Sequence, residues 1–329
     1  MHRRTAVTDR NACDDDPSDA TRVYGVDFSA AARDAGTNTW IATGTVTDSG
    51  LRIVDVEPLV EFADLPSADR TDALPALAAW IRGLGEETVV GLDFPFGLPR
   101  FVVEATGHDS WRSFVGGFPD SLVRSTETGD PVHAFAERCV ELTESHGEGT
   151  YDKRATDRVV GARSPYGFIA DTITFYGLRD VLAPVIDAVR VEPIDAIRDG
   201  SDALDSPGVT ETTGTGLPPS GPTLVETYPA AVLDALGLPR TKYKGSSDAE
   251  TTRRRQNAEG VAAEAGLGYT EPEDLVDRIV DDDGGDALDA VAACLGAYAA
   301  STDGFSVVTD EVDPETVALE GYIYALRGR

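Results

Sequence analysis

Five acidic residues lie in segments whose sequence predicts buried strands or one helix face. Asp27 ends the run VYGVD, Asp93 ends TVVGLD, and Glu226 lies in TLVETYP. Asp286 and Asp289 are three residues apart in GGDALDAVAAC, so they share one face of the helix expected there. A carboxylate at the end of a buried strand is costly unless a cation or hydrogen-bond donors pair with it. The set therefore predicts a cation site and phosphate chemistry.

Carboxylate oxygens are the ligands that Mg²⁺ or Mn²⁺ would take here, together with waters and substrate phosphates. Two such ions about 4 Å apart can activate a water and stabilise the leaving oxygen of a phosphodiester. We expect Asp27 to bridge both ions, and Asp93 and Glu226 each to hold one. Asp286 and Asp289 would then complete the second site.

Each acid also has a simpler interpretation. Asp27 could face solvent from an edge strand, and Asp93 precedes Phe-Pro, where an aspartate is ordinary turn chemistry. Glu226 could pair with a buried arginine. The preference of a helix N-terminus for acids explains Asp286, and explains Asp289 less well because small apolar residues surround it.

A local basic stretch supports phosphate binding. Residues 240–255 read RTKYKGSSDAETTRRR and hold six of the 28 cationic residues and two of the three lysines. The expected contacts to substrate phosphate are Lys242, Lys244, Arg253, Arg254 and Arg255. The alternative is a solvated helix start in which Asp248 and Glu250 are the partners. For Arg154 and Asp157 we favour a structural role.

Several classes of site are disfavoured. The four histidines lie in the N-terminal segment or between residues 100 and 150, so zinc sites and Ser-His-Asp triads are not expected. The three cysteines are widely spaced and form no C-x-x-C pair, which argues against disulfides. No G-x-G-x-x-G or Walker-type loop is present, which disfavours a Rossmann or P-loop enzyme.

The net charge is -30, with 58 acidic residues against 28 Lys and Arg. An acid-rich, lysine-poor composition is typical of proteins from salt-rich cytoplasm, where salt screens the self-repulsion. We therefore expect a halophilic, archaeal, cytoplasmic protein, and the charge argues only weakly against a nucleic-acid partner. No apolar run approaches the roughly 20 residues of a membrane span, so no membrane association is expected.

The order of expected elements defines the fold class. Alternating or apolar runs predict strands over residues 22–30, 38–46 and 51–62, a helix over 67–85 and a buried strand over 87–99. This β-β-β-α-β order is the first half of a ribonuclease H-like fold. We expect an α/β domain with a mixed five-stranded sheet, in which three antiparallel strands precede parallel strands and helices flank the sheet.

The remaining segments complete the domain. We expect a disordered tail over residues 1–21 and one domain over 22–329, with a helical insertion at about 100–165 and a mobile loop at 199–222. Further helices are expected over 170–189, 229–238, 248–265 and 286–300, with a buried strand over 222–229 between them.

Several motifs together resemble the domain-of-unknown-function 429 family (DUF429). They are GVDFSA, GLDFPFGLP, VETYPAAV, the K-Y-K-G patch, GGDALDAVAACLGAYA and EGYIY. The family is described as predicted nucleases of ribonuclease H-like fold, and the resemblance covers about residues 22–325. It implies that Asp27, Asp93, Glu226, Asp286 and Asp289 form the acidic site. Glu320 also matches a family position, where it would assist the site or cap the last strand. Gly285-Asp286 replaces a His-Asp or Asp-Asp pair of the family.

The expected function is a metal-dependent nuclease or phosphodiesterase acting on DNA or RNA. Two alternatives stay open. Nucleotide-dependent phosphotransferases share this sheet, although DFSAAARDAG and DFPFGLP match their phosphate hairpins only in part. A non-catalytic nucleic-acid or metabolite-binding protein could also keep the acids. The pair Asp286 and Asp289 resembles the closing pair of RuvC-type resolvases, which act as dimers, so a homodimer is considered.

Overall fold

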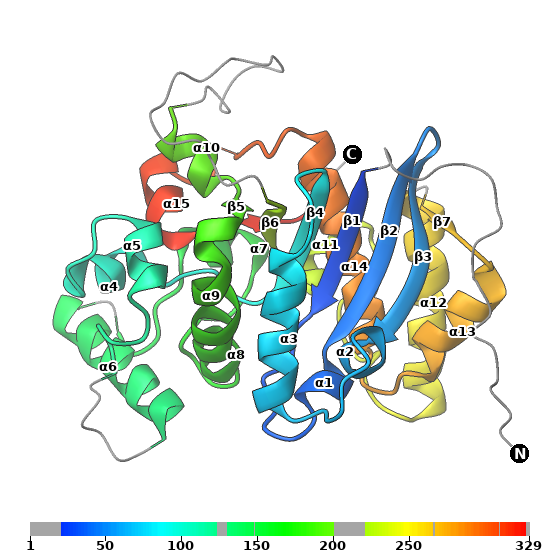
Figure 1. Ribbon diagram of the computed structural model, residues 1–329, viewed down its shortest axis with the longest axis horizontal. Helices are drawn as coiled ribbons and strands as arrows, with labels where there is room; N and C mark the ends of the chain where they lie inside the picture. Colours follow the sequence, from blue (N-terminus) through cyan, green and yellow to red (C-terminus); the bar gives the residue numbers. More distant parts are fainter. Residues whose placement is uncertain are drawn as a thin grey trace, which may run out of the picture.

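The computed structural model describes residues 21–123, 130–147, 149–200, 221–265, 267–308 and 310–326. Almost all of the expected N-terminal tail, and residues 201–220 of the expected mobile loop, lie outside the described residues. The described chain forms one mixed sheet flanked by helices on both faces (Figure 1). None of the described helices is long and apolar enough to cross a membrane.

Five strands form the centre of the sheet. The strands β1 (Arg22–Asp27), β2 (Trp40–Thr47) and β3 (Gly50–Pro58) are antiparallel neighbours. The strand β4 (Thr88–Asp93) is parallel to β1, and β6 (Thr223–Thr227) is parallel to β4. These five strands confirm the expected mixture of antiparallel and parallel pairing.

The sheet has eight strands in the described residues, so the expected number of five was too low. The added strands β5 (Arg190–Val191), β7 (Gly268–Tyr269) and β8 (Ile323–Tyr324) are only two residues long. The order is β5-β6-β4-β1-β2-β3-β7, and β8 also pairs with β6. The run VRVEPIDAI, read from the sequence as a strand and turn, contains β5, whereas segments as short as β7 and β8 show too little alternation to be recognised.

One face of the sheet is covered by helices from two parts of the chain, residues 35–82 and residues 170–188. They are α1 (Ala35–Asn38), α2 (Leu59–Phe62), α3 (Arg70–Arg82), α8 (Ala170–Tyr176), the π-helix η2 (Gly177–Leu182), α9 (Ala183–Val185) and the 3-10 turn η3 (Ile186–Ala188). In α3, Leu74, Leu77 and Ile81 recur at helical spacing and are buried in this face's core.

The segment expected as an insertion adds α4 (Arg100–Ala105), α5 (Trp111–Gly116), α6 (Pro131–His146) and α7 (Ala155–Val160). Trp111 and Phe135 of these helices belong to the same hydrophobic cluster as the strand residues Val26 and Leu92. Figure 1 shows α4, α5 and α6 beside the sheet edge that holds β5. The helix α10 (Ile194–Arg198) follows β5.

The opposite face is covered by helices from the last third of the chain. They are α11 (Pro229–Ala235), α12 (Asp248–Ala265), α13 (Pro272–Asp281) and α14 (Asp286–Thr302), and α15 (Pro314–Glu320) precedes β8. Ala287, Val291 and Leu295 of α14 pack with Val23 of β1 and Val225 of β6 in a second core. The expected boundaries of α12 are confirmed, and α14 extends two residues beyond the expected end.

Candidate functional site

Two aspartates meet at the carboxyl ends of adjacent parallel strands. Asp27 is the last residue of β1, Asp93 is the last residue of β4, and the two are register partners. Side chains alternate between the faces of a strand, so Asp27 shares its face with Val23, which packs in the core under α14. Asp93 lies on the same face. Asp27 is 8% exposed.

Two glycines let α14 approach this pair. Gly25 and Gly91 lie two residues before the aspartates and are also register partners. A Cβ on Gly25 would lie 2.1 Å from the carbonyl oxygen of Ala290, and one on Gly91 would lie 2.7 Å from that of Ala293. The backbone of α14 therefore rests directly on β1 and β4. This contact fixes the distance between α14 and the sheet, and it thereby fixes the position of Asp289.

The first turn of α14 brings two further carboxylates to the strand ends. Asp289 is buried, and Asp286 is partly exposed at the start of the helix. Lys244 Nζ lies 2.9 Å from Asp286 Oδ1 and 2.8 Å from Asp289 Oδ2. The Tyr243 hydroxyl donates to Asp289 Oδ1 at 2.7 Å. Both oxygens of Asp289 are thus engaged by consecutive residues of the loop before α12.

The carboxylates repel one another. Burial raises the pKa of Asp27 well above its ordinary value, and the charge of Lys244 opposes this rise. The other three acids of the cluster add to it. Burial and then repulsion by Asp289 raise the pKa of Asp93 to about 8. Burial also raises the pKa of Asp289, against the effect of Lys244. Burial alone would lower the pKa of Lys244, but the surrounding carboxylates outweigh it and raise that pKa.

This arrangement leaves an excess of negative charge beside a single ammonium. Asp27, Asp93, Asp286 and Asp289 together face Lys244. Burial is the main cause of the raised pKa values of Asp27, Asp93 and Asp289, and repulsion between the carboxylates adds to it. Their oxygens are the donors that hard divalent cations take. Within the described residues, no three His, Cys, Asp or Glu side chains are already arranged around a metal position. The donor chemistry fits a divalent cation that would compete with Lys244.

Glu226 lies elsewhere than expected. In β6, Val225 packs in the core under α14, whereas Leu224 packs in the opposite core, and Glu226 shares the face of Leu224. Its Oε1 accepts from Arg154 Nη2 at 2.5 Å, and its Oε2 accepts from Arg154 Nη1 at 2.7 Å. The Phe96 amide also donates to Oε2 at 3.0 Å. The expectation that Glu226 joins the facing acids is corrected: it forms the buried ion pair that was the alternative.

Arg154 is the centre of a buried network that the sequence did not reveal as such. Its guanidinium is fully buried and also pairs with Asp157, with Nη2 at 2.7 Å from Oδ1. The carbonyl oxygen of Glu320 accepts from Nη1 at 3.2 Å. Burial raises the pKa of Glu226, and the charge of Arg154 opposes that rise. The structural role that we favoured for Arg154 and Asp157 is what these contacts provide.

Glu320 acts as a helix cap. Its Oε1 accepts from the Arg100 amide at 2.7 Å and its Oε2 from the Ala155 amide at 2.6 Å. Arg100 and Ala155 are the first residues of α4 and α7, so one carboxylate satisfies the free amides of two helix starts. Of the two roles considered for Glu320, capping is therefore the one observed, although it caps helices rather than the last strand.

The basic stretch divides into residues with different roles. Arg254 is fully buried and donates to the carbonyl oxygens of Val280 and Tyr243, and to Asp283 Oδ1. The expectation that Arg254 contacts phosphate is corrected, because its guanidinium has no access to solvent. Lys244 is a counter-ion of the acids, although half of its side chain remains exposed.

The other three basic residues stay accessible. Lys242 is exposed, and Arg253 donates to its carbonyl oxygen. Arg255 is exposed and pairs with Asp277 at 2.8 Å. These positions are compatible with phosphate contacts, and Lys242 and Arg253 adjoin the loop that carries Tyr243. The contact of Tyr243 with Asp289 was not expected; a tyrosine between two lysines of an acidic chain was the one signal for it.

Comparison with curated proteins gives one distant similarity. The chain is 29% identical over 189 residues to a protein of Mycolicibacterium smegmatis (strain ATCC 700084 / mc(2)155) named "Putative glutamate--cysteine ligase 2-2". The matched region covers 54% of this chain and 46% of the relative, so the chain spans about half of the relative's length. No solved structure was found to match the chain.

Comparison with family models supports the resemblance drawn from the motifs. Residues 208–313 match the family described as "Protein of unknown function (DUF429)". This region holds Glu226, Lys244, Asp286 and Asp289, whereas Asp27 and Asp93 precede it. The match covers about a third of the chain, and over this region the chain is similar to the DUF429 family.

Proposed function

We propose that the protein is a divalent-metal-dependent phosphodiesterase of ribonuclease H-like fold that cleaves nucleic acid. The observation that carries the proposal is the convergence of Asp27, Asp93 and Asp289, with raised pKa values, at the carboxyl-terminal ends of β1 and β4. This end of the sheet is called the acidic edge. Buried acids that repel one another are costly unless they serve a bound cation. The central order β3-β2-β1-β4-β6 supports the fold assignment.

The residues that would hold the metal are Asp27, Asp93 and Asp289, with Asp286 at the exposed side. A divalent ion bound there supplies a water of lowered pKa and neutralises charge on the phosphodiester. Tyr243 holds one oxygen of Asp289 and so orients the carboxylate. Lys244 balances the acids when no metal is bound, and its half-exposed side chain can turn to a substrate phosphate.

The proposed setting is the cytoplasm of a halophilic archaeon, since acidic residues outnumber basic ones 58 to 28. In such a chain, a phosphate contact needs local positive charge. Lys242 and Arg253 supply it beside the acidic edge. The similarity to the ligase-named protein spans under half of that protein, so it does not support a ligase activity for this chain.

The test is cleavage in molar KCl of labelled single-stranded, duplex, hybrid and branched substrates with Mg²⁺ or Mn²⁺. The variant Asp27→Asn should lose cleavage by more than the roughly 100-fold typical of outer-shell metal partners. The matched control is Asp48→Asn, the same change at an exposed position between β2 and β3. Because β2 is antiparallel to β1, that turn lies at the opposite edge of the sheet from Asp27. Cleavage that survives in Asp27→Asn would sink the proposal.

A further inference from the structure

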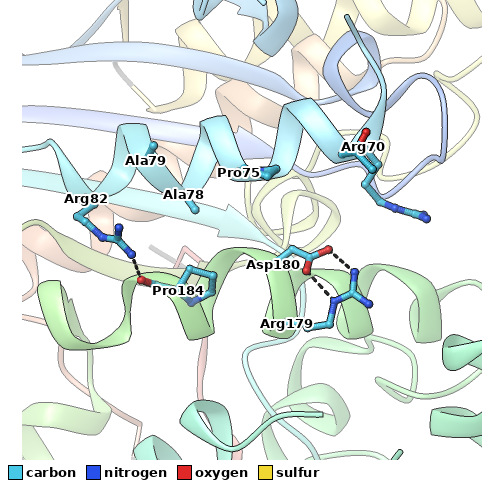
Figure 2. A pocket seen from close by; sticks show the side chains of 9 residues that line it. Arg70, Pro75, Ala78, Ala79, Arg82, Arg179, Asp180 and Pro184 are labelled. Atoms are coloured by element: carbon cyan, nitrogen blue, oxygen red, sulfur yellow. Dashed lines mark hydrogen bonds and ion pairs between the residues drawn. The ribbon is translucent and has the colours of Figure 1, made fainter. Parts of the chain in front are cut away.

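A groove of about 530 Å³ runs between α3 and the helical segment formed by η2 and α9. Figure 2 shows Arg70 at one end of it, Arg82 at the other, and Arg179 with Asp180 across from α3. Small side chains of α3 and Pro184 of α9 form the remaining walls. The groove is thus a channel with arginines placed along its length.

The charge of the groove is opposite to that of the whole protein. Three arginines line it against one aspartate, which leaves a formal charge of +2 in a chain of net charge -30. Among the described residues, neither Arg70 nor Arg82 has a carboxylate partner. Arg70 Nη1 donates to the Ala30 carbonyl at 2.8 Å, and Arg82 donates to the Pro184 carbonyl. Their charges are therefore not neutralised by an acid.

Arg70 and Arg179 are held in place by aromatic rings. The guanidinium of Arg70 lies 3.6 Å from the ring centroid of Tyr176, and that of Arg179 lies 4.8 Å from the same ring. Arg179 also makes two bonds to Asp180, at 2.6 and 2.7 Å. A cation in the first turn of a helix opposes the helix dipole, so Arg70 stands where stability alone disfavours it. Fixed guanidinium groups of this kind are suited to phosphate oxygens.

One end of the groove adjoins the acidic edge of the sheet. The Arg70 side chain binds Ala30, three residues after Asp27. Gly177, the first residue of η2, lies so close to Phe94 that a Cβ would be 2.4 Å from its ring, and Phe94 follows Asp93. Arg82 is twelve residues from Arg70 on α3, which at 1.5 Å per residue places it roughly 18 Å further along. The groove thus lies on the face of the sheet opposite to α14, and its Arg70 end reaches the loops that follow the two aspartates.

We propose that this groove binds successive phosphate groups of a nucleic-acid strand whose scissile phosphodiester lies at the acidic edge. The inference rests on the proposed function and adds a path for the substrate. At roughly 3.4 Å per nucleotide in a stacked strand, the interval from Arg70 to Arg82 corresponds to about five nucleotides. Arg82 therefore contributes only to strands long enough to span that interval.

The experiment measures binding of labelled single strands of about three and about twelve nucleotides to the Asp27→Asn protein, which removes cleavage. The wild-type groove should bind the long strand more tightly than the short one. Adding the change Arg82→Gln to the Asp27→Asn protein should reduce this difference in affinity severalfold. It should also lower the slope of log K against log salt by about 0.7 for the long strand. The matched control is Arg52→Gln, which removes one exposed arginine on β3, three strands from β4. It should leave both quantities unchanged.

A second variant guards against a folding effect. Arg179→Gln, with its fold verified by circular dichroism, should weaken binding of the long strand as Arg82→Gln does. Equal affinities in Arg82→Gln and Arg52→Gln, with an unchanged salt slope, would overturn the groove proposal even if metal-dependent cleavage is found. The predicted losses in a protein that never cleaves would support the groove and refute the nuclease. Binding of inorganic phosphate alone, without the long strand, would overturn the strand path.

Discussion

The ammonium nitrogen of Lys244 lies 2.8 Å from Oδ2 of Asp289. The same nitrogen lies 2.9 Å from Asp286, so the lysine stands where an added cation would be attracted. A metal and this ammonium would compete for the same oxygens. The competition makes Lys244 a reporter of the cation site.

The variant Lys244→Gln should lower the melting temperature in EDTA, because the acids lose their partner. With Mn²⁺ the stabilisation should exceed that of wild type, because no ammonium has to leave. A tenfold tighter Kd adds about 1.4 kcal/mol to that stabilisation. Differential scanning fluorimetry with EDTA and with Mn²⁺ measures both values. Lys242→Gln, an exposed lysine two residues earlier, is the control. A Mn²⁺ effect that is smaller in Lys244→Gln than in wild type would contradict the competition.

The pKa of Asp93, raised to about 8, predicts how metal-free stability depends on pH. Between the unfolded value near 3.8 and this folded value, the folded protein keeps a proton that the unfolded chain has released. The free energy of unfolding therefore falls as pH rises through this window. Asp93→Asn should show a flatter decline of melting temperature than wild type in EDTA. The exposed change Asp48→Asn should leave the wild-type slope, and equal slopes in all three proteins would argue against this titration.

Replacing Arg154 with methionine should destabilise the protein by about 3–5 kcal/mol, the usual cost of leaving a buried charge without its partner. Glu226→Gln should also lower stability, yet keep the stabilisation by Mn²⁺, because Glu226 faces away from the other acids. Urea unfolding with and without Mn²⁺ separates the two effects. If Mn²⁺ no longer stabilises the Glu226→Gln variant, Glu226 would have to be a metal ligand after all.

Tyr243→Phe removes the donor that orients Asp289. As an outer-shell partner, it should cost about 10- to 100-fold in Mn²⁺ affinity or cleavage rate. Tyr269→Phe provides the comparison, since that hydroxyl donates to the backbone carbonyl of Ala258 at 3.0 Å. If the two variants lose cleavage equally after correction for folded protein, Tyr243 has no special role.

Gly25→Ala should cost at least the 1–3 kcal/mol of an overpacked core, because its Cβ would collide with the backbone of α14. Any relief requires α14 to move outward, which would carry Asp289 away from Asp27. Stability and Mn²⁺ affinity should fall together. Gly85→Ala has no heavy atom within 4 Å of the new Cβ and should change neither. A Gly25→Ala protein of normal stability would disprove the close contact.

Four of the five acids that the sequence predicts to lie together do so in the structure. The fifth, Glu226, does not, for a physical reason. Asp27 and Asp93 end strands in the same register, and helical spacing pairs Asp286 with Asp289. The strand of Glu226 is buried on both faces, so Leu224 and Val225 are equally apolar and its alternation is invisible. A shift of one residue along a strand moves a side chain to the other face of the sheet, and nothing in this apolar strand indicates which residues face α14.

The basic residues were harder to assign for a similar reason. Arg253, Arg254 and Arg255 are consecutive on α12, and only packing against the loop and α13 decides which of them is buried. The helix boundaries at Asp248 and Ala265 were predicted, but its rotation was not. The charge pattern thus located the cationic segment without sorting its members.

The ion pair between Arg154 and Glu226 has a consequence for how this architecture can change over evolution. Arg154 comes from the segment that looked like an addition to the sheet, yet it neutralises a carboxylate on a central strand. Deleting that segment would leave the buried Glu226 without its ion-pair partner and would remove the helix starts that Glu320 caps. A shorter homologue that lacks α7 must therefore also replace both glutamates, which makes these three positions a linked unit of inheritance.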